Sequence, residues 1–473
     1  IWAKKVLVDN YAVVPDKDGN RSVERYLPLD NYGIHYGSER CVHLFIVGMN
    51  QMGTALGIQA ALLAHYPNFH RNHNLRTTIT FVDDQAVKEG EFFRGRFAQL
   101  FSLCRFRTMK DDEVKCRQSV KWIDPMDKPD FAYKHTTPVG SDFHNFLDIQ
   151  WEFIQGNIAS EEIQKYMIEE AEKTLPSDDG NGEKGGEKKQ NAIECTVAIC
   201  FNNPQQSAAT AVYLPEKLLK RVNQVLVYQQ NKFELVKMVS SSELEWKRYE
   251  KLKPFGMLED CYTKNMFEDI RAQLVHRLYY RQDDIIAPNG NDEKSKLAAL
   301  AMFDSEIDEM KRHWDELDMS SKLANINLVD SLGTKLRSLG IVEYQDLKDL
   351  SFNAKARCLR IFSDGIREDI EETLKSSQKD VEYMVKIEHT RWLTERLIMG
   401  YRPVNSEELK QLQDLENDEI EFLNKKDSLK VKNRAHLDIC SNATLHDADK
   451  LIGRKNNDKK IVKKLPYVIR VLS

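Results

Sequence analysis

Short apolar runs separated by amphipathic stretches dominate the first half of the chain. The first compact run covers residues 42–47, and a stretch with helical periodicity, residues 54–66, follows it directly. Further apolar runs that predict strands come at residues 78–82, 147–154, 195–201 and 224–228. Strands that alternate with helices are typical of a parallel sheet, because each parallel connection crosses back over the sheet. The pattern therefore predicts an α/β fold with a doubly wound parallel sheet.

Polar residues or glycines follow the predicted strands. The first strand leads into the turn Gly48-Met49-Asn50-Gln51-Met52-Gly53, which approaches the G-x-G-x-x-G pattern of dinucleotide-binding turns, with Asn50 at the middle glycine. The carboxyl ends of parallel strands share one edge, and the N–H groups at a helix start attract anions. We therefore expect a nucleotide site at this edge, formed by Gly48, Asn50, Gln51, Met52, Gly53, Asp83, Asp84, Gly156, Asn157, Asn202 and Asn203.

Helical spacing replaces the strand pattern beyond residue 256. Apolar residues recur at every third position in Leu323, Ile326, Val329 and Leu332, which favours helix. The last hundred residues are also mostly helical in pattern. The predicted organisation is an entry segment, a Rossmann-type domain, a helical connector and a helical C-terminal unit, at residues 1–40, 41–260, 261–375 and 376–473.

Residues 384–403 combine aromatic and charged side chains. In a helix, His389, Trp392 and Arg396 fall on one face, and Gly400 ends the helix before Tyr401. Such a group can stack on an aromatic base and neutralise a phosphate. A tryptophan at this spacing is more often a core residue with a polar neighbour, and spacing alone favours that second interpretation.

Composition narrows the classes of function. The chain has 69 Lys+Arg against 74 Asp+Glu, a net charge of −5, so we do not expect nucleic acid as a partner. It contains no apolar run of 18 residues, so it is not expected to span a membrane by itself. Without a G-x-S-x-G, H-E-x-x-H or P-loop signature, no enzyme activity is expected. Eight cysteines without a C-x-x-C pair, and the spacing of His65, His70 and His73, give little support for a metal site.

Two resemblances to known families extend this interpretation. The segments GMNQMG, FVDD, QGN and CFNNP, within about residues 41–260, resemble the TrkA-N type of Rossmann domain, a nucleotide-binding regulator of potassium channels and transporters. Asn50 and Asn157 stand where that family usually has Gly and Asp. The order EHTRW, GYRP, AHLDI, within about residues 378–473, resembles the bacterial form of the ryanodine-receptor repeat (RyR) domain, although Gly-Trp is commoner there than Gly400-Tyr401.

Together the resemblances imply the ligand-sensing regulatory region of a membrane ion channel or related effector, at the cytoplasmic face of the membrane. The implied ligand is a nucleotide-type small molecule such as NAD(H) or another adenine nucleotide. Expected partners are a membrane pore encoded before Ile1 and further copies of the chain in a homo-oligomer, serving by analogy in stress or antiviral signalling. The implied RyR-type ligand residues are His389, Trp392, Arg396, Tyr401, Arg402, His436 and Asp438. An NAD-dependent oxidoreductase and a non-liganded assembly scaffold are the alternatives.

Overall fold

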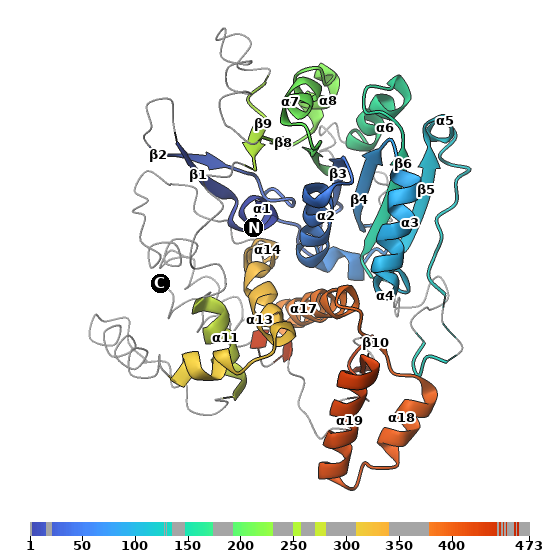
Figure 1. Ribbon diagram of the computed structural model, residues 1–473, viewed down its shortest axis with the longest axis vertical. Coiled ribbons are helices and arrows are strands. Elements are labelled where there is room, and N and C mark those ends of the chain that lie inside the picture. Colours follow the sequence, from blue (N-terminus) through green and yellow to red (C-terminus); the bar gives the residue numbers. More distant parts are fainter. Residues whose placement is uncertain are drawn as a thin grey trace.

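A seven-stranded, all-parallel sheet forms the centre of the computed structural model (Figure 1). The structure describes residues 2–15, 21–126, 128, 130–134, 147–173, 193–229, 249–256, 270–280, 309–339, 378–441, 444, 445, 448, 451, 458, 459, 461 and 462. Large parts of the predicted connector, at residues 281–308 and 340–377, lie outside this described part. The strands are β3 (Cys41–Val47), β4 (Thr77–Asp83), β5 (Arg105–Lys110), β6 (Ile149–Gln155), β7 (Ile193–Ile199), β8 (Gln224–Tyr228) and β9 (Leu252–Phe255).

The strand order is β5-β6-β4-β3-β7-β8-β9. From β3 the chain builds one half of the sheet, then returns to the other side of β3 with β7, so the order reverses between these two strands. The predicted α/β class and five predicted strands are confirmed. The prediction missed the two edge strands, β5 and β9.

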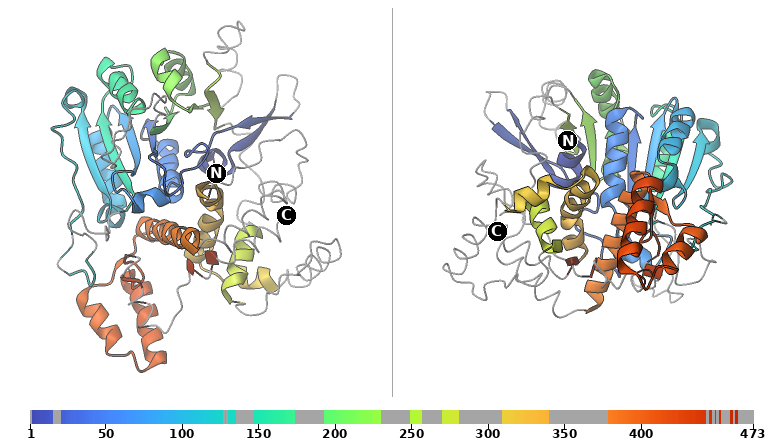
Figure 2. Two further views of the ribbon diagram at one scale, coloured as in Figure 1. Left: turned by 180° about the vertical axis from the view of Figure 1, so that it is seen from behind. Right: turned by 60° about the horizontal axis from the view of Figure 1, so that its bottom comes forward.

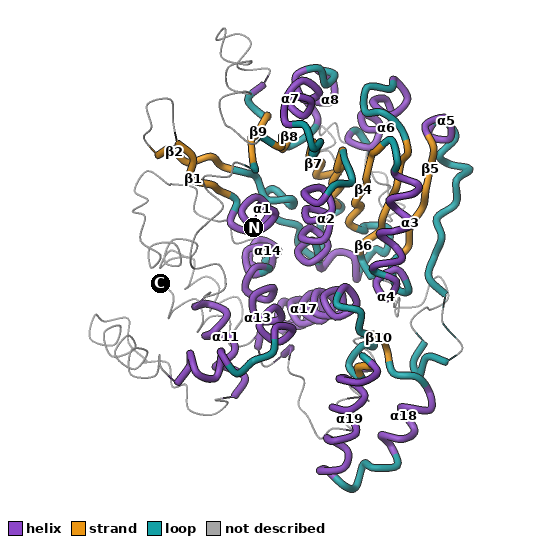
Figure 3. Tube along the Cα trace, in the orientation of Figure 1, coloured by secondary structure: helices purple, strands orange, loops and turns teal. Residues whose placement is uncertain are grey.

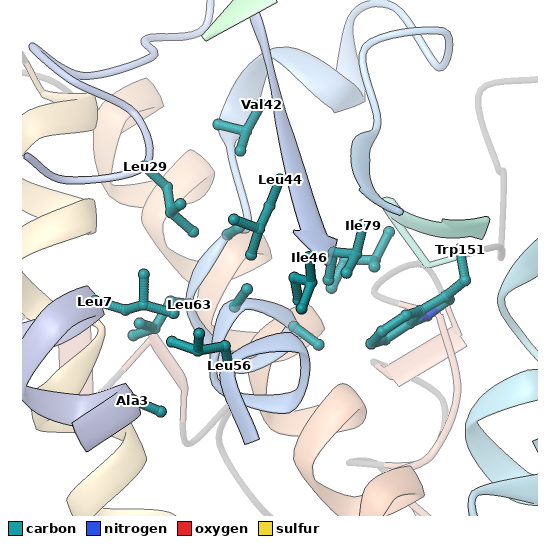
Figure 4. Packing of buried hydrophobic residues seen from close by; sticks show 14 of the residues in the cluster. Ala3, Leu7, Leu29, Val42, Leu44, Ile46, Leu56, Leu63, Ile79 and Trp151 are labelled. Atoms are coloured by element: carbon teal, nitrogen blue, oxygen red, sulfur yellow. The ribbon is translucent and has the colours of Figure 1, made fainter. Parts of the chain in front are cut away.

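Helices cover both faces of the sheet, and β3 is buried on both sides (Figure 3). Helices α2 (Gln51–Leu63), α3 (Ala86–Arg96) and α4 (Ala98–Phe101) contribute to one core, and α5 (Asp111–Val114), α6 (Glu161–Ala171), α7 (Pro204–Val212) and α8 (Glu216–Arg221) to the other. Alternate residues of β3 divide between the two cores: Val42, Leu44 and Ile46 face α2, as Figure 4 shows, whereas Phe45 and Val47 face the opposite side. Each such side chain contributes about 1.5–3 kcal/mol on burial.

Several described residues among the first forty pack on the sheet. They form α1 (Trp2–Lys4), the π-helix η1 (Lys5–Asp9) and an antiparallel hairpin of β1 (Tyr11–Pro15) and β2 (Arg21–Arg25). Leu7 and Leu29 lie in the same core as Leu44 and Leu63 (Figure 4). The segment predicted as an entry region therefore completes one face of the sheet.

Part of the helical C-terminal half lies against the amino-terminal end of the sheet (Figure 2). Its elements are α11 (Ile270–Tyr280), α13 (Met319–Asp330), α14 (Leu332–Ser338), α17 (Gln378–Ile398), α18 (Ser406–Gln413) and α19 (Glu419–Asn433), with a short parallel pair of β10 (Arg402–Pro403) and β11 (Ala435–His436). Helix α17 packs against α2, α4, α13 and the 3-10 helix η2 (Pro67–His70). Among the described residues, no helix combines the length and apolar character that a membrane crossing requires.

Candidate functional site

The carboxyl ends of the central strands lie level, as the prediction of a shared edge requires. Val47 is in register with both Val82 and Ile199, and Asp83 is in register with Gln155. The structure therefore brings the predicted turn and the polar residues that follow the neighbouring strands to one edge of the sheet.

The turn after β3 is shaped by packing of the backbone. Gly48 has φ +103°, and a β-carbon there would lie 2.7 Å from the carbonyl oxygen of Cys200. A β-carbon at Gly53 would overlap the carbonyl oxygen of Gly48. Asn50 precedes α2, and its Oδ1 accepts the N–H of Gly53 at 2.9 Å, so it caps the helix.

Hydrogen bonds within the protein already occupy the polar groups of this edge. The Nδ2 of Asn50 donates to Oδ1 of Asn202 at 2.9 Å and to the carbonyl oxygen of Cys200. These bonds link the turn after β3 to the turn after β7, the two strands between which the strand order reverses. The carboxylate of Asp83 accepts the N–H groups of Met49 at 2.9 Å and Gln85 at 2.8 Å. These groups therefore already make bonds within the protein before any ribose or phosphate binds.

The remaining predicted residues of the edge have mainly local contacts. Asn203 caps α7 by accepting the N–H of Gln205 at 3.0 Å, and Asn157 accepts the N–H of Ala159 at 2.9 Å. Met52 packs on the core, and a β-carbon at Gly156 would meet Ile163. The exposed residues among them are Gln51, Asp84, Asn157, Asn202 and Asn203.

Five of the seven residues predicted for the second site gather near the carboxyl end of α17. With Arg434 they form what we call the Trp392 cluster, which consists of His389, Trp392, Arg396, Tyr401, Arg434 and His436. The ring of Trp392 stacks with His389 at 6.2 Å between centroids and meets His436 edge-on at 5.0 Å. Tyr401 also meets His436 edge-on, at 6.3 Å. Trp392 is half-buried and so keeps part of its surface exposed.

Two guanidinium groups border these rings. Arg396 lies 5.4 Å from the centroid of Trp392 and 5.7 Å from that of Tyr401, and Arg434 lies 5.8 Å from that of Tyr401. The buried Nε of Arg396 has no hydrogen-bond partner within the described part of the chain. Arg434 was not predicted, and the only sequence signal for it is its place next to the AHLDI segment.

His389 is held as an imidazolium. Its Nε2 lies 2.8 Å from the carbonyl oxygen of Cys440 and its Nδ1 lies 3.1 Å from Oδ2 of Asp458. Both partners are acceptors, so both ring nitrogens must carry protons. Burial alone would lower the pKa of His389, but the hydrogen bond and charge of Asp458 outweigh it and raise the pKa above 6.5.

We expect His389 to make the free energy of unfolding decrease as the pH rises above neutral. A raised pKa in the folded state stabilises the fold fully below about 6.5, and that contribution is lost as the pH rises through the folded pKa. Denaturant midpoints measured from neutral to alkaline pH should show this loss, and His389→Gln should remove it. The same substitution at exposed His35 is the matched control; an unchanged profile in His389→Gln would contradict the assignment.

The other two predicted residues lie outside the ring contacts. Arg402 makes a bidentate ion pair with Glu408, at 2.9 and 2.7 Å, in the first turn of α18. Asp438 donates its N–H to Nδ1 of His436 at 3.2 Å. Burial lowers the pKa of His436 to about 3 despite the nearby Asp438, so this imidazole is neutral.

A network of buried ion pairs lies in the interface between α14 and α17. Lys335 donates to Glu388 at 2.6 Å, Arg391 pairs with the same carboxylate at 2.7 Å, and Arg391 also pairs with Glu395 at 2.6 Å. All four side chains are at most 3% exposed. This network was not predicted, since its members come from segments 53 residues apart.

The histidine group that was considered for a metal is structural. His65 pairs with buried Asp148 at 2.7 Å, and His73 packs edge-on against Phe69. Within the described ranges, no group of three or more His, Cys, Asp or Glu side chains is arranged to hold a metal ion.

No family model, curated protein or solved structure matches this chain.

Proposed function

We propose that this chain is the ligand-sensing regulatory region of a membrane channel or related effector, and that a nucleotide-type ligand binds at the Trp392 cluster. The observation that carries the proposal is the double role of α17. Residues Trp392 and Arg396 of this helix belong to the cluster, while Leu393 and Leu397 lie in the core of the sheet. The helix therefore joins a candidate ligand site to the main body of the fold.

The chemistry of the cluster suits an aromatic anion. Trp392 is partly buried and keeps some exposed surface that an aromatic base could contact, and Arg396 and Arg434 supply positive charge in the cluster. The buried Nε–H of Arg396 is a donor that a phosphate oxygen could satisfy. An adenine nucleotide combines both features. The edge of the sheet is the weaker candidate, because Asn50 and Asp83 already bond to protein groups there.

The packing of α17 also supplies a route for coupling. Tyr401, Trp392 and Ile398 pack against the core that contains Leu56 of α2, and α2 begins directly after Asn50. A ligand that favours one position of α17 would therefore shift the packing of α2 and of the turn. For this the ligand needs only to bind one arrangement of α17 more tightly than the other. The resulting change in packing could then act on a pore outside this chain. The RyR-like and TrkA-N-like resemblances support the same assignment.

Thermal unfolding with nucleotides tests the proposal. The ligands are NAD⁺, NADH, ATP, AMP, ADP-ribose and cyclic AMP, each compared with buffer. A ligand at 100 times its dissociation constant adds about 2.7 kcal/mol to the stability of the folded state. We expect at least one of them to raise the melting temperature, and Trp392→Ala to abolish the increase.

Two matched variants locate the site. Arg402→Gln changes a neighbouring arginine that pairs with Glu408 and should keep the response. Asp83→Asn should keep it as well, because Asp83 belongs to the edge of the sheet. A response lost in Asp83→Asn and kept in Trp392→Ala would move the site to the sheet, and hydride transfer there would establish the oxidoreductase.

A non-liganded scaffold is the second candidate function. The hydrogen bond from Asn50 to Asn202 favours it, because it uses polar groups of the turn that a dinucleotide would bind. Absence of a thermal response to all six nucleotides would contradict the sensor and leave this scaffold.

A further inference from the structure

Helix α19 carries apolar side chains on two opposite faces. Phe422 and Leu429 are buried and pack in the core that α19 shares with Leu412 of α18. Across the helix, Ile420 and Val431 are 73% and 77% exposed, and Leu423 between them is 37% exposed. At 100° per residue these three form one outer stripe. A helix with apolar residues on both faces is typical of one covered on both sides.

The charges of α19 are separated along its length. Glu419 and Glu421 lie in the first turn, and Lys430 and Lys432 lie in the last. Figure 1 shows the α18–α19 hairpin extending away from the sheet, at the bottom of the view. A long, accessible helix with opposite charges at its ends is complementary to an antiparallel copy of itself.

We propose that the outer stripe of α19 binds the same stripe of a second copy of this chain, in an antiparallel pair related by a two-fold axis. With Ile420 opposite the partner's Val431, the two-fold axis brings Glu421 beside the partner's Lys432 on one flank of the stripe and Glu419 beside the partner's Lys430 on the other. Every one of these contacts occurs twice, as an isologous interface requires. The parallel alternative would place like charges together.

The area that the outer stripe can bury limits the affinity of the proposed dimer. A helix of 15 residues is about 22 Å long, so two of them bury less than the 1,200 Å² of a standard interface. We therefore expect a weak, reversible dimer with a dissociation constant in the micromolar range. Added salt should weaken it, because the Glu–Lys contacts lie at the exposed rim.

Sedimentation velocity of the full chain across the micromolar range tests the pair without any ligand, so its result is independent of the proposed function. We expect a concentration-dependent shift from monomer to dimer in the native chain. Ile420→Lys and Val431→Lys should each abolish it. Tyr213→Lys changes an 82% exposed residue at the end of α7 and should not. A monomer at every concentration, or a dimer unaffected by both stripe variants, would overturn the proposal.

A charge exchange tests the antiparallel register. Glu421→Lys and Lys432→Glu should each raise the dissociation constant about tenfold, because each replaces two attractive contacts by two repulsive ones. The double variant should return it toward the native value, because Lys then lies opposite Glu again. Far-UV circular dichroism checks that α19 remains helical with exchanged charges. Two weakened single variants without recovery in the folded double variant would rule out this register.

Discussion

Replacing Arg391 by methionine is expected to lower the free energy of unfolding by about 3–5 kcal/mol, which is typical when one partner of a buried ion pair is removed. Arg391 is 1% exposed and holds both Glu388 and Glu395. Burial alone would raise the pKa of Glu388, but the charges of Arg391 and Lys335 lower it to about 2. Without the guanidinium, Glu388 would keep only Lys335, and Glu395 would keep only the weaker contact with Arg396 at 3.7 Å. Denaturant midpoints measure the loss.

A pair of controls separates charge compensation from packing. Arg312→Met changes an exposed arginine and should stay within about 0.5 kcal/mol of the native protein. The double variant Lys335→Met with Glu388→Leu removes one charge of each sign and leaves the pair of Arg391 with Glu395. We expect it to be more stable than either of its single variants. A double variant whose loss equals the sum of the single losses would contradict a coupled network.

The pKa of Glu388 is lowered in the folded protein, whereas that of His389 is raised, so Glu388 should affect stability at acid rather than alkaline pH. A lowered pKa stabilises the fold above the ordinary value of 4.5, and this contribution is lost as the pH falls toward about 2. The interface between α14 and α17 should therefore be among the acid-sensitive parts of the protein.

Helical spacing predicted the Trp392 cluster better than it predicted the charge network. Residues three and four positions apart share a face in any helix, so His389, Trp392 and Arg396 could be grouped from the sequence. Spacing does not say which charged residues face another helix. The burial of Arg391 depends on Lys335 and on the packing of α14, and the local sequence carries no sign of either.

In the sheet, too, the elements with a clear local sequence pattern were predicted, and those without one were not. Strands β3 and β7 are buried on both faces, so their sequences are continuous apolar runs and were predicted. Strand β5 lies at the edge and has only two apolar residues among six, and edge strand β9 contains Pro254. Neither gives the apolar run that marks a central strand. The bond between Asn50 and Asn202 was equally hidden, because it joins strands 152 residues apart.

Gly53→Ala is expected to destabilise the protein by about 2–3 kcal/mol without any nucleotide present. Its β-carbon would overlap the carbonyl oxygen of Gly48 and approach the side chain of Ile46 at 3.1 Å. The closest atom belongs to the backbone, which cannot change rotamer as a side chain can. Helix α2 would therefore have to move away from β3. Thermal and denaturant unfolding of the two proteins in plain buffer measures the difference.

The matched control is Gly95→Ala, near the end of α3. A β-carbon there would meet nothing within 4 Å, so the substitution should stabilise the protein by about 0.5–1 kcal/mol through helix propensity. Opposite signs at these two helical glycines would show that Gly53 is required by the contact between α2 and β3. A Gly53→Ala variant of native stability that binds nucleotide more weakly would instead assign this glycine to the ligand. The comparison thus decides whether the glycine-containing turn is explained by packing alone, which its sequence pattern cannot do.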